Sequence, residues 1–208
     1  MGDRPLSAIA KSLQGSVTDA EDVDPTQFCA GGNEFVKLLE SLGPFALPVA
    51  QQAKGNLDKI AGSAKALGGD GSMRTLLQKE RDSGMHGSGT ELKDPSAAIG
   101  VIWVVRFLAF WEEVCLARVS ADVSITFKET LEDAYKHNLK DFCGGVVQMS
   151  FNTALLAVPQ WKDVRDKLGP QASFQEDVFE WMDASQAVQT TLMKIIKEYN
   201  MNDERKSM

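Results

Sequence analysis

Apolar residues recur at helical spacing along almost the whole chain. After Pro25 the pattern continues until Gly43–Pro44 interrupts it, through Phe28, Phe35, Val36, Leu38, Leu39 and Leu42. Further glycine or proline breaks divide the rest of the sequence. We therefore predict roughly eight helices, over about 25–42, 45–67, 72–81, 95–118, 127–142, 146–158, 159–168 and 174–199.

Start signals support two of these helices. Asp24–Pro25 and Asp94–Pro95 each place an N-cap residue before a proline at the first helical position. The only β-branched cluster, Val119 to Phe127, falls where a connection is expected. The pattern predicts one all-α domain over residues 1–208, with about 1–20 and 200–208 peripheral to it.

Composition narrows the class of protein. The chain has 208 residues, 43% of them hydrophobic and 25% charged, which is typical of a globular protein with a sizeable core. The net charge of -7 disfavours nucleic acid as a partner. The longest apolar stretch, Ala97–Trp111, contains Arg106 and is shorter than the roughly 20 residues of a membrane span. Three cysteines without zinc spacing and an N-terminus unlike a secretory signal predict a cytoplasmic protein.

Catalytic and metal-binding signatures are missing from the sequence. The glycine-rich stretch from Gly68 to Ser72 lacks the lysine of a phosphate-binding loop, so it is interpreted as a turn. The only histidines, His86 and His137, are both expected to be solvated. Cys143 as a nucleophile would need a base that the sequence does not supply, and a small buried thiol is the commoner role. We predict a protein without enzymatic activity, metal or cofactor.

Two polar-and-aromatic stripes are the remaining candidates for a site. Ile99, Trp103, Arg106 and Phe110 share one face of the predicted 95–118 helix. Gln52, Asn56 and Lys59 form a stripe on the 45–67 helix. By spacing alone, the simplest interpretation is a core tryptophan and a solvated face, and a ligand site is the alternative.

Several segments together resemble the glycolipid transfer protein family. The resemblance runs in order from about Phe28 to Leu168. It rests on Ser41-Leu42-Gly43-Pro44, Gly55-Asn56-Leu57-Asp58-Lys59-Ile60, Ile102-Trp103-Val104-Val105-Arg106-Phe107-Leu108-Ala109-Phe110, Ala134-Tyr135, Leu139, Val146-Val147-Gln148, Phe151 and Ala157-Val158-Pro159.

The resemblance implies a two-layer α-helical sandwich that transfers or senses a glycolipid through transient contact with membranes and without covalent chemistry. It implies that Trp103 stacks on the sugar and that Asn56 and Lys59 donate hydrogen bonds to it. Gln52 and Cys143 would occupy the remaining headgroup positions, and the chains would lie in an apolar chamber lined by Ile99, Phe110, Phe151 and Leu155.

This chain departs from the family at positions that bear on the ligand. The family has an aspartate at Gln52 and a histidine at Cys143, and these two grip the ceramide amide. Their replacement weakens recognition of a sphingolipid amide. This favours a glycolipid on a glycerol backbone, and the alternative is an interaction or scaffold protein whose lipid site has degenerated.

Two further departures concern the headgroup and the membrane. The ceramide-phosphate branch of the family carries arginines where this chain has Ile99 and Trp103, so recognition of a phosphate is poorly supported. Gly145 replaces a family tryptophan near the pocket mouth. Trp161 is a candidate substitute at the bilayer interface, and partial burial in a short helix is the alternative.

Overall fold

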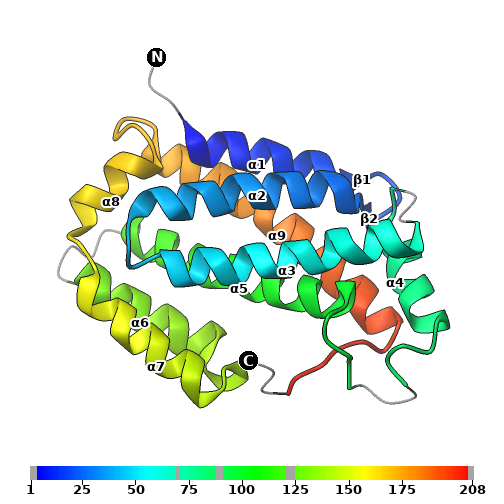
Figure 1. Cartoon of the computed structure of the whole chain (residues 1–208). Helices are drawn as coiled ribbons and strands as arrows, with labels where there is room; N and C mark the ends of the chain where they lie inside the picture. The colour runs from blue at the N-terminus through cyan, green and yellow to red at the C-terminus, as the bar shows by residue number, and fades with distance from the viewer. Residues whose placement is uncertain (1–3, 69–70, 88–90, 120–124, 206–208) are drawn as a thin grey trace.

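The computed structural model describes residues 4–68, 71–87, 91–119 and 125–205. Within these ranges the chain forms nine α-helices, two single-turn 3₁₀ helices and one two-stranded hairpin (Figure 1). The α-helices are α1 (Pro5–Ser16), α2 (Pro25–Leu42), α3 (Leu47–Leu67), α4 (Met73–Asp82), α5 (Ala97–Val119), α6 (Phe127–Asn138), α7 (Gly145–Ala154), α8 (Trp161–Leu168) and α9 (Phe174–Glu198). The 3₁₀ helices are η1 (Lys140–Phe142) and η2 (Leu155–Ala157), and strands β1 (Val17–Thr18) and β2 (Asp22–Val23) pair antiparallel.

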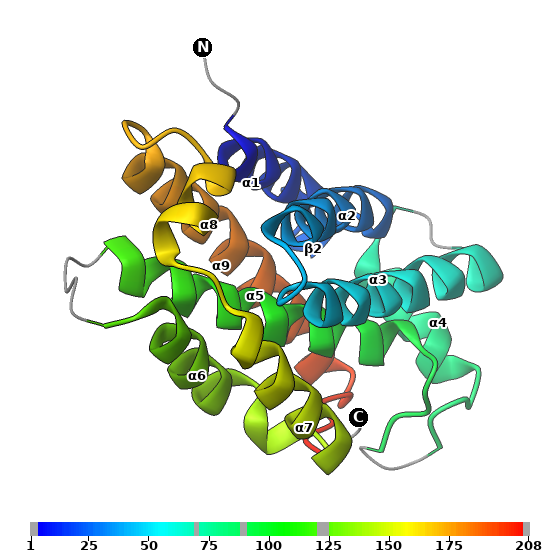
Figure 2. The ribbon, with the colours of Figure 1, turned by 60° about the vertical axis from the view of Figure 1, so that its left-hand side comes forward.

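The long helices form two packed layers. In one layer α1, α2 and α3 lie side by side, and in the other α5 is flanked by α9 and α6 (Figure 2). The layers meet where α1 packs on α9 and α3 packs on α5. α5 is buried on nearly every side, as its apolar sequence predicts, and one continuous hydrophobic core joins the two layers. The predicted all-α sandwich is confirmed.

The chain termini contribute more than the predicted peripheral segments. Residues 4–16 include α1, which the sequence analysis missed and which buries Leu6, Ile9 and Leu13 against α2 and α9. Beyond α9, Met201 is fully buried and Asp203 is 5% exposed. The described parts of 1–20 and 200–208 therefore belong to the packed structure, because both carry side chains that complete the core.

The start of α5 differs from the predicted Asp94 cap. The helix begins at Ala97, and the Ser96 hydroxyl accepts the N–H of Ile99. The carboxylate of Glu80, fully buried on α4, accepts the N–H groups of Ala97 and Ala98. A carboxylate at a helix N-terminus satisfies free donors and interacts favourably with the helix dipole. The Asp24 cap of α2 is confirmed, with Oδ1 accepting from Thr26 and Gln27.

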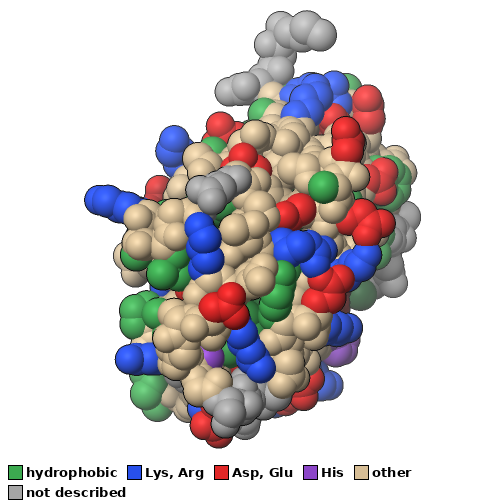
Figure 3. Space-filling view, turned by 90° about the vertical axis from the view of Figure 1, so that its right-hand side faces the viewer, with side chains coloured by type: hydrophobic (Ala, Val, Ile, Leu, Met, Phe, Trp, Pro, Cys, Tyr) green, Lys and Arg blue, Asp and Glu red, His purple; other side chains and the backbone are tan. Residues whose placement is uncertain are grey.

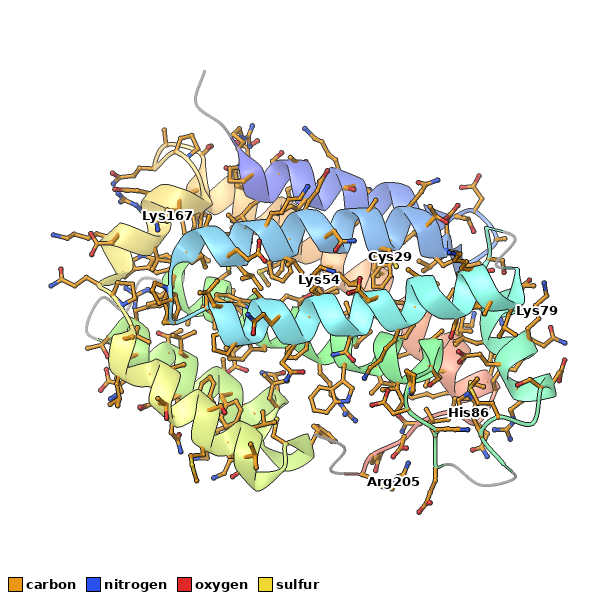
Figure 4. The ribbon with its side chains drawn as sticks, in the orientation of Figure 1. Cys29, Lys54, Lys79, His86, Lys167 and Arg205 are labelled. Carbon is orange, nitrogen blue, oxygen red and sulfur yellow. The ribbon has the colours of Figure 1, made fainter. Side chains whose placement is uncertain are left out.

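The segment between α4 and α5 is tied to this buried carboxylate. His86 lies 6% exposed rather than solvated, with Nε2 3.4 Å from Glu80 Oε2 and Nδ1 accepting the N–H of Lys93 at 3.1 Å. Figure 4 shows His86 and Arg205 at the same end of the molecule. The neighbouring face, which carries α4, has acidic and basic side chains interspersed (Figure 3). Within the described residues, no helix is long and apolar enough to cross a bilayer.

A close contact between α3 and α5 sets the position of the candidate site. At Gly100, a Cβ atom would lie 2.5 Å from the main-chain oxygen of Asn56 and 2.8 Å from Ile60. Only glycine permits this approach without a shift of one backbone. The approach brings the polar stripe of α3 beside Trp103, one turn further along α5.

Candidate functional site

A pocket of about 400 Å³ opens between α3, α5, α6 and α7. Its walls combine aromatic and aliphatic side chains with a few polar ones, and no lysine or arginine is among the lining residues. We call it the central pocket. It is lined by Pro48, Val49, Gln51, Gln52, Trp103, Phe107, Tyr135, Leu139, Cys143, Val146, Val147, Ser150, Phe151 and Ala154.

Trp103 lines the central pocket but is not an exposed platform. Its side chain is 1% exposed, and its ring packs against Phe107 at 5.9 Å between centroids. The guanidinium of Arg106, one turn later on α5, lies 5.0 Å from the indole centroid and 3.5 Å from the ring of Phe142. A planar ligand can therefore stack on the indole only after its covering side chains move.

The C-terminal segment holds Arg106 in this position. Arg106 donates from Nη2 to the main-chain oxygen of Asp203 at 3.0 Å. The Asp203 carboxylate accepts the N–H of Leu92 at 2.8 Å and is paired with Arg205. Burial lowers the pKa of Arg106 to about 10, so its charge persists at neutral pH. Burial opposes ionisation of Asp203, but hydrogen bonds from Arg205 and Leu92 outweigh it and lower its pKa to about 2.

The α3 stripe is divided between the pocket and its surroundings. Gln52 is exposed and lines the central pocket. Asn56 is 1% exposed and does not line it; its Nδ2 donates to the main-chain oxygen of Gln52 at 2.9 Å, while its Oδ1 is buried without a partner among the described residues. Lys59 is outside the pocket lining as well, and its ammonium pairs with Asp94 at 2.8 Å.

Cys143 and Tyr135 form the wall opposite α3. Cys143 is 3% exposed, and burial raises the pKa of its thiol despite the opposing effects of Tyr135 and Arg106. The thiol therefore stays protonated at neutral pH, as expected for a buried cysteine without a nucleophilic role. Tyr135 is 7% exposed and stacks on Phe151 with 3.9 Å between ring centroids.

Behind the central pocket the interior is nearly filled. Phe151 and Ala154 border both the pocket and a void of about 20 Å³, which we call the inner void. Phe110 and Leu155 also border the inner void, so three of the four predicted chain-lining residues lie around it. Ile99 is 3% exposed and borders neither space. A further void of about 10 Å³ lies between α2, α3 and α5.

α7 is the least firmly packed wall of the pocket. None of its ten residues is buried, whereas α5 beside it is almost wholly enclosed. Val146 and Met149 are 80% and 70% exposed, and Leu156 on η2 is 82% exposed. Trp161, by contrast, is partly buried against Phe127, with 5.3 Å between ring centroids. The partial-burial interpretation of this tryptophan is therefore the one that the geometry favours.

Sequence reasoning named part of this arrangement. Gln52, Trp103, Cys143 and Phe151 come together in one pocket, whereas Asn56 and Lys59 flank it and Ile99 lies outside it. Tyr135 and the Asp203 segment were missed as site components. Tyr135 could have been found from the Ala134-Tyr135 pair in the family resemblance, but no sequence pattern connects Asp203 with Arg106.

Two other grooves on the described structure are larger than the central pocket. One of about 470 Å³ adjoins it and shares Pro48, Ser150 and Ala154 with it. A larger groove of about 760 Å³ lies between α1, α2 and the segment around Asp166–Gln171, but it is rimmed by charged side chains and is remote from Trp103. Among the described residues, no group of three or more histidine, cysteine, aspartate or glutamate side chains is placed to hold a metal ion.

The sequence and the fold both have relatives among known proteins. A family model for glycolipid transfer protein matches residues 23–170. The glycolipid transfer protein of Aureobasidium melanogenum is 25% identical over 212 residues, covering 97% of this chain and 97% of that protein. Human ceramide-1-phosphate transfer protein, solved with 12:0 ceramide-1-phosphate, has a TM-score of 0.85 at 16% identity and covers 97% of this chain and 99% of its own. A fungal glycolipid transfer protein has a TM-score of 0.76 at 21% identity, covering 94% of this chain and 95% of its own.

Proposed function

This chain belongs to the glycolipid transfer protein family, and from that premise we propose that it binds a glycolipid in the central pocket and carries it between membranes without catalysis. The observation that carries the proposal is a 400 Å³ pocket with a polar edge at Gln52 and an apolar continuation toward the inner void. Pockets of this size and mixed lining are typical of small-molecule sites. The sugar stacks on Trp103, and the chains enter the space around Phe110, Phe151 and Leu155.

The charge of the pocket favours a sugar over a phosphate headgroup. A buried phosphate needs cationic partners, and the pocket lining contains none. The two nearest basic groups are already engaged, Lys59 with Asp94 and Arg106 with the main chain of Asp203. A neutral sugar needs only hydrogen bonds, which the Gln52 amide and the Ser150 hydroxyl in the pocket lining can provide.

Gln52 and Cys143 indicate whether the bound lipid is built on glycerol or on ceramide. Neither residue is ionised, so neither makes the charge-assisted bond that a carboxylate offers to the N–H of a ceramide amide. A glycerol-based glycolipid has esters with no N–H to satisfy. We therefore propose a glycosyl-diacylglycerol as the preferred ligand; a helical scaffold protein with a degenerate lipid site is the second candidate, supported by these same two residues.

A vesicle-to-vesicle transfer assay separates the candidates. We expect a fluorescent glycosyl-diacylglycerol to transfer faster than a glycosylceramide, and ceramide-1-phosphate to transfer least. Gln52→Asp should shift the preference toward the glycosylceramide by roughly 2- to 10-fold because it restores a charge-assisted bond. Gln175→Asp, on the exposed side of α9, serves as the matched control.

Two results would contradict this proposal. A clear preference of the unmodified protein for the ceramide lipid would eliminate the glycerol backbone. No transfer of any lipid, together with no lipid in the purified protein by mass spectrometry, would favour the scaffold protein instead.

Contact with the membrane is assigned to α7 and η2. Their exposed apolar side chains at Val146, Met149 and Leu156 lie beside the pocket that the lipid must enter. A side chain at Gly145 would meet no atom within 4 Å, so this position also projects into open space. Apolar and aromatic side chains at such an edge favour the bilayer interface.

Paired variants test the contact with the membrane. Met149→Ser should weaken binding to neutral phosphatidylcholine vesicles, measured by co-sedimentation, and Gly145→Trp should strengthen it, because indole favours the interface. Phe179→Ser, an equivalent exposed change on α9, should have little effect. Equal losses for Met149→Ser and Phe179→Ser would assign the contact elsewhere.

A further inference from the structure

The buried hydroxyl of Tyr135 makes no well-formed hydrogen bond with the described residues. Its polar neighbour is the thiol of Cys143, which is only a weak hydrogen-bonding partner. A buried phenol normally finds a partner, because leaving it unpaired costs the desolvation of that group. Other side chains share this property, including Asn56 and Trp181, but Tyr135 is the one that also lines the central pocket.

The ring of Tyr135 is held in a fixed orientation. Phe151 of α7 stacks on it with 12° between the ring planes. Tyr135 lies on α6, four residues before Leu139 and eight before Cys143, and all three line the pocket. The position of the hydroxyl is therefore set by the stack on Phe151.

The surroundings of the hydroxyl make it a donor. Burial raises the pKa of Tyr135, as does the neighbouring Cys143 thiol, so the phenol stays protonated. Arg106, the nearby cation, lowers the pKa of Cys143 but is engaged with Asp203 and two aromatic rings. The thiol is a weak donor and a weak acceptor. The strongest hydrogen-bond donor left on this wall is the hydroxyl of Tyr135.

Tyr135 also lies at the boundary between the polar part of the pocket and its apolar part. On one side are Trp103, Gln52 and Cys143, and on the other are Phe151 and Ala154, which lead to the inner void. In a glycerolipid the ester carbonyl lies at the same kind of boundary, between the polar headgroup and the hydrocarbon chain. A carbonyl oxygen is an acceptor with no donor of its own, which complements a phenolic O–H.

We propose that Tyr135 donates its hydroxyl hydrogen to an acyl carbonyl of the bound lipid and thereby makes the site selective for acyl over alkyl chains. This inference rests on the proposed function and deepens it, because it names the chemical group that is read at the boundary of headgroup and chain. A lipid with ether-linked chains lacks the acceptor and leaves the hydroxyl unpaired.

Binding of two matched lipids tests the inference. The probes are a glycosyl-diacylglycerol and its dialkyl ether analogue in detergent micelles, titrated while tryptophan fluorescence is recorded. We expect Tyr135→Phe to raise the Kd for the diacyl lipid roughly 2- to 10-fold and to leave the Kd for the ether lipid unchanged. The protein has one other tyrosine, and Tyr199→Phe is the control that should change neither.

Two further measurements separate a ligand contact from a structural role. The thermal unfolding midpoint of Tyr135→Phe should match or exceed that of the unmodified protein, because the variant keeps the stack on Phe151 and removes an unpaired buried hydroxyl. Cys143→His, which adds a ring N–H donor to the same wall, should restore acyl selectivity in the Tyr135→Phe background.

The remaining outcomes overturn the inference. Equal weakening of both lipids, or no change in either, would show that the hydroxyl does not read the carbonyl, while binding by the unmodified protein would leave the glycolipid proposal intact. Failure of the unmodified protein to bind either lipid would eliminate the proposed function and this inference together.

Discussion

Arg106 links the aromatic wall of the candidate site to the end of the chain. Its guanidinium lies between Trp103 and Phe142, and its hydrogen bond to the main chain of Asp203 fixes it there. A cation–π contact of this kind is worth about 0.5–2 kcal/mol, an amount that a sugar stacked on the same indole can offset. In the proposed function, the sugar would replace the Arg106 guanidinium as the partner of the Trp103 ring.

Asp203 is expected to stabilise the fold through its charge. Its pKa is lowered from the ordinary value of 3.8 to about 2 in the folded protein. The stabilisation is therefore complete above pH 3.8 and is lost as the pH falls through about 2. Asp203→Asn should lower the free energy of unfolding at pH 7 by on the order of 2 kcal/mol.

Urea unfolding of the two proteins at several pH values measures this effect. The difference between Asp203→Asn and the unmodified protein should shrink as the pH falls from about 5 toward 2.5. Asp133→Asn, at an exposed position on α6, is the control and should differ little at any pH. A difference that is constant over this range would mean that the charge of Asp203 is not the cause.

Individual side chains mark the limits of prediction from sequence. Trp103 and Gln52 could be placed in one site through the family resemblance, whereas helical spacing alone favoured a core tryptophan, and Trp103 is indeed 1% exposed. The contact of Arg106 with Asp203 could not be predicted, because the two residues are 97 positions apart. His86 was expected in solvent because the sequence around it is rich in glycine and gives no sign of its contact with the buried Glu80.

The crossing of α3 and α5 depends on the absence of a side chain at Gly100. Gly100→Ala should lower the free energy of unfolding by about 1–3 kcal/mol, because the new methyl group would overlap the main chain of Asn56. Lipid transfer should fall as well, since α3 carries Gln52. Gly62→Ala, on the open side of α3, should instead stabilise by about 0.5–1 kcal/mol.

Chemical unfolding and the transfer assay together measure these two variants. A Gly100→Ala protein as stable and active as the unmodified one would show that the close approach of the helices is unnecessary.

Helices were easier to predict than their starting points. The long predicted segments depend on apolar periodicities, and the core imposes those periodicities directly. The start of α5 was misassigned to Asp94 because its true cap involves Ser96 and a carboxylate from another helix, Glu80. α1 was missed because residues 1–20 were set aside as peripheral, although Leu6, Ile9 and Leu13 recur at helical spacing and the helix packs on α9.

The proposed lipid uptake requires the interior of the molecule to expand, because the voids behind the central pocket total only tens of Å³. Each methylene removed from water gains about 0.8 kcal/mol, and this gain can drive the opening. The helix with the fewest internal contacts to lose is α7, in which no residue is buried.

Hydrogen exchange followed by mass spectrometry should reveal this motion. Without lipid, amides of α7 should exchange much faster than those of α5, because local stability follows burial. Addition of a glycosyl-diacylglycerol should slow exchange in α7 and leave α5 nearly unchanged. Slowing confined to the α4–α5 segment would assign the opening to the other end of the molecule.

The loose attachment of α7 has a consequence for the range of cargo. Because α7 is weakly packed, it can adapt to acyl chains of different length and unsaturation. The N-terminus of α5, in contrast, is held by the Glu80 carboxylate. Tail variants of one glycolipid should then compete almost equally. Under the proposed function, discrimination would then rest on the headgroup and the acyl carbonyls, and not on the hydrocarbon chains.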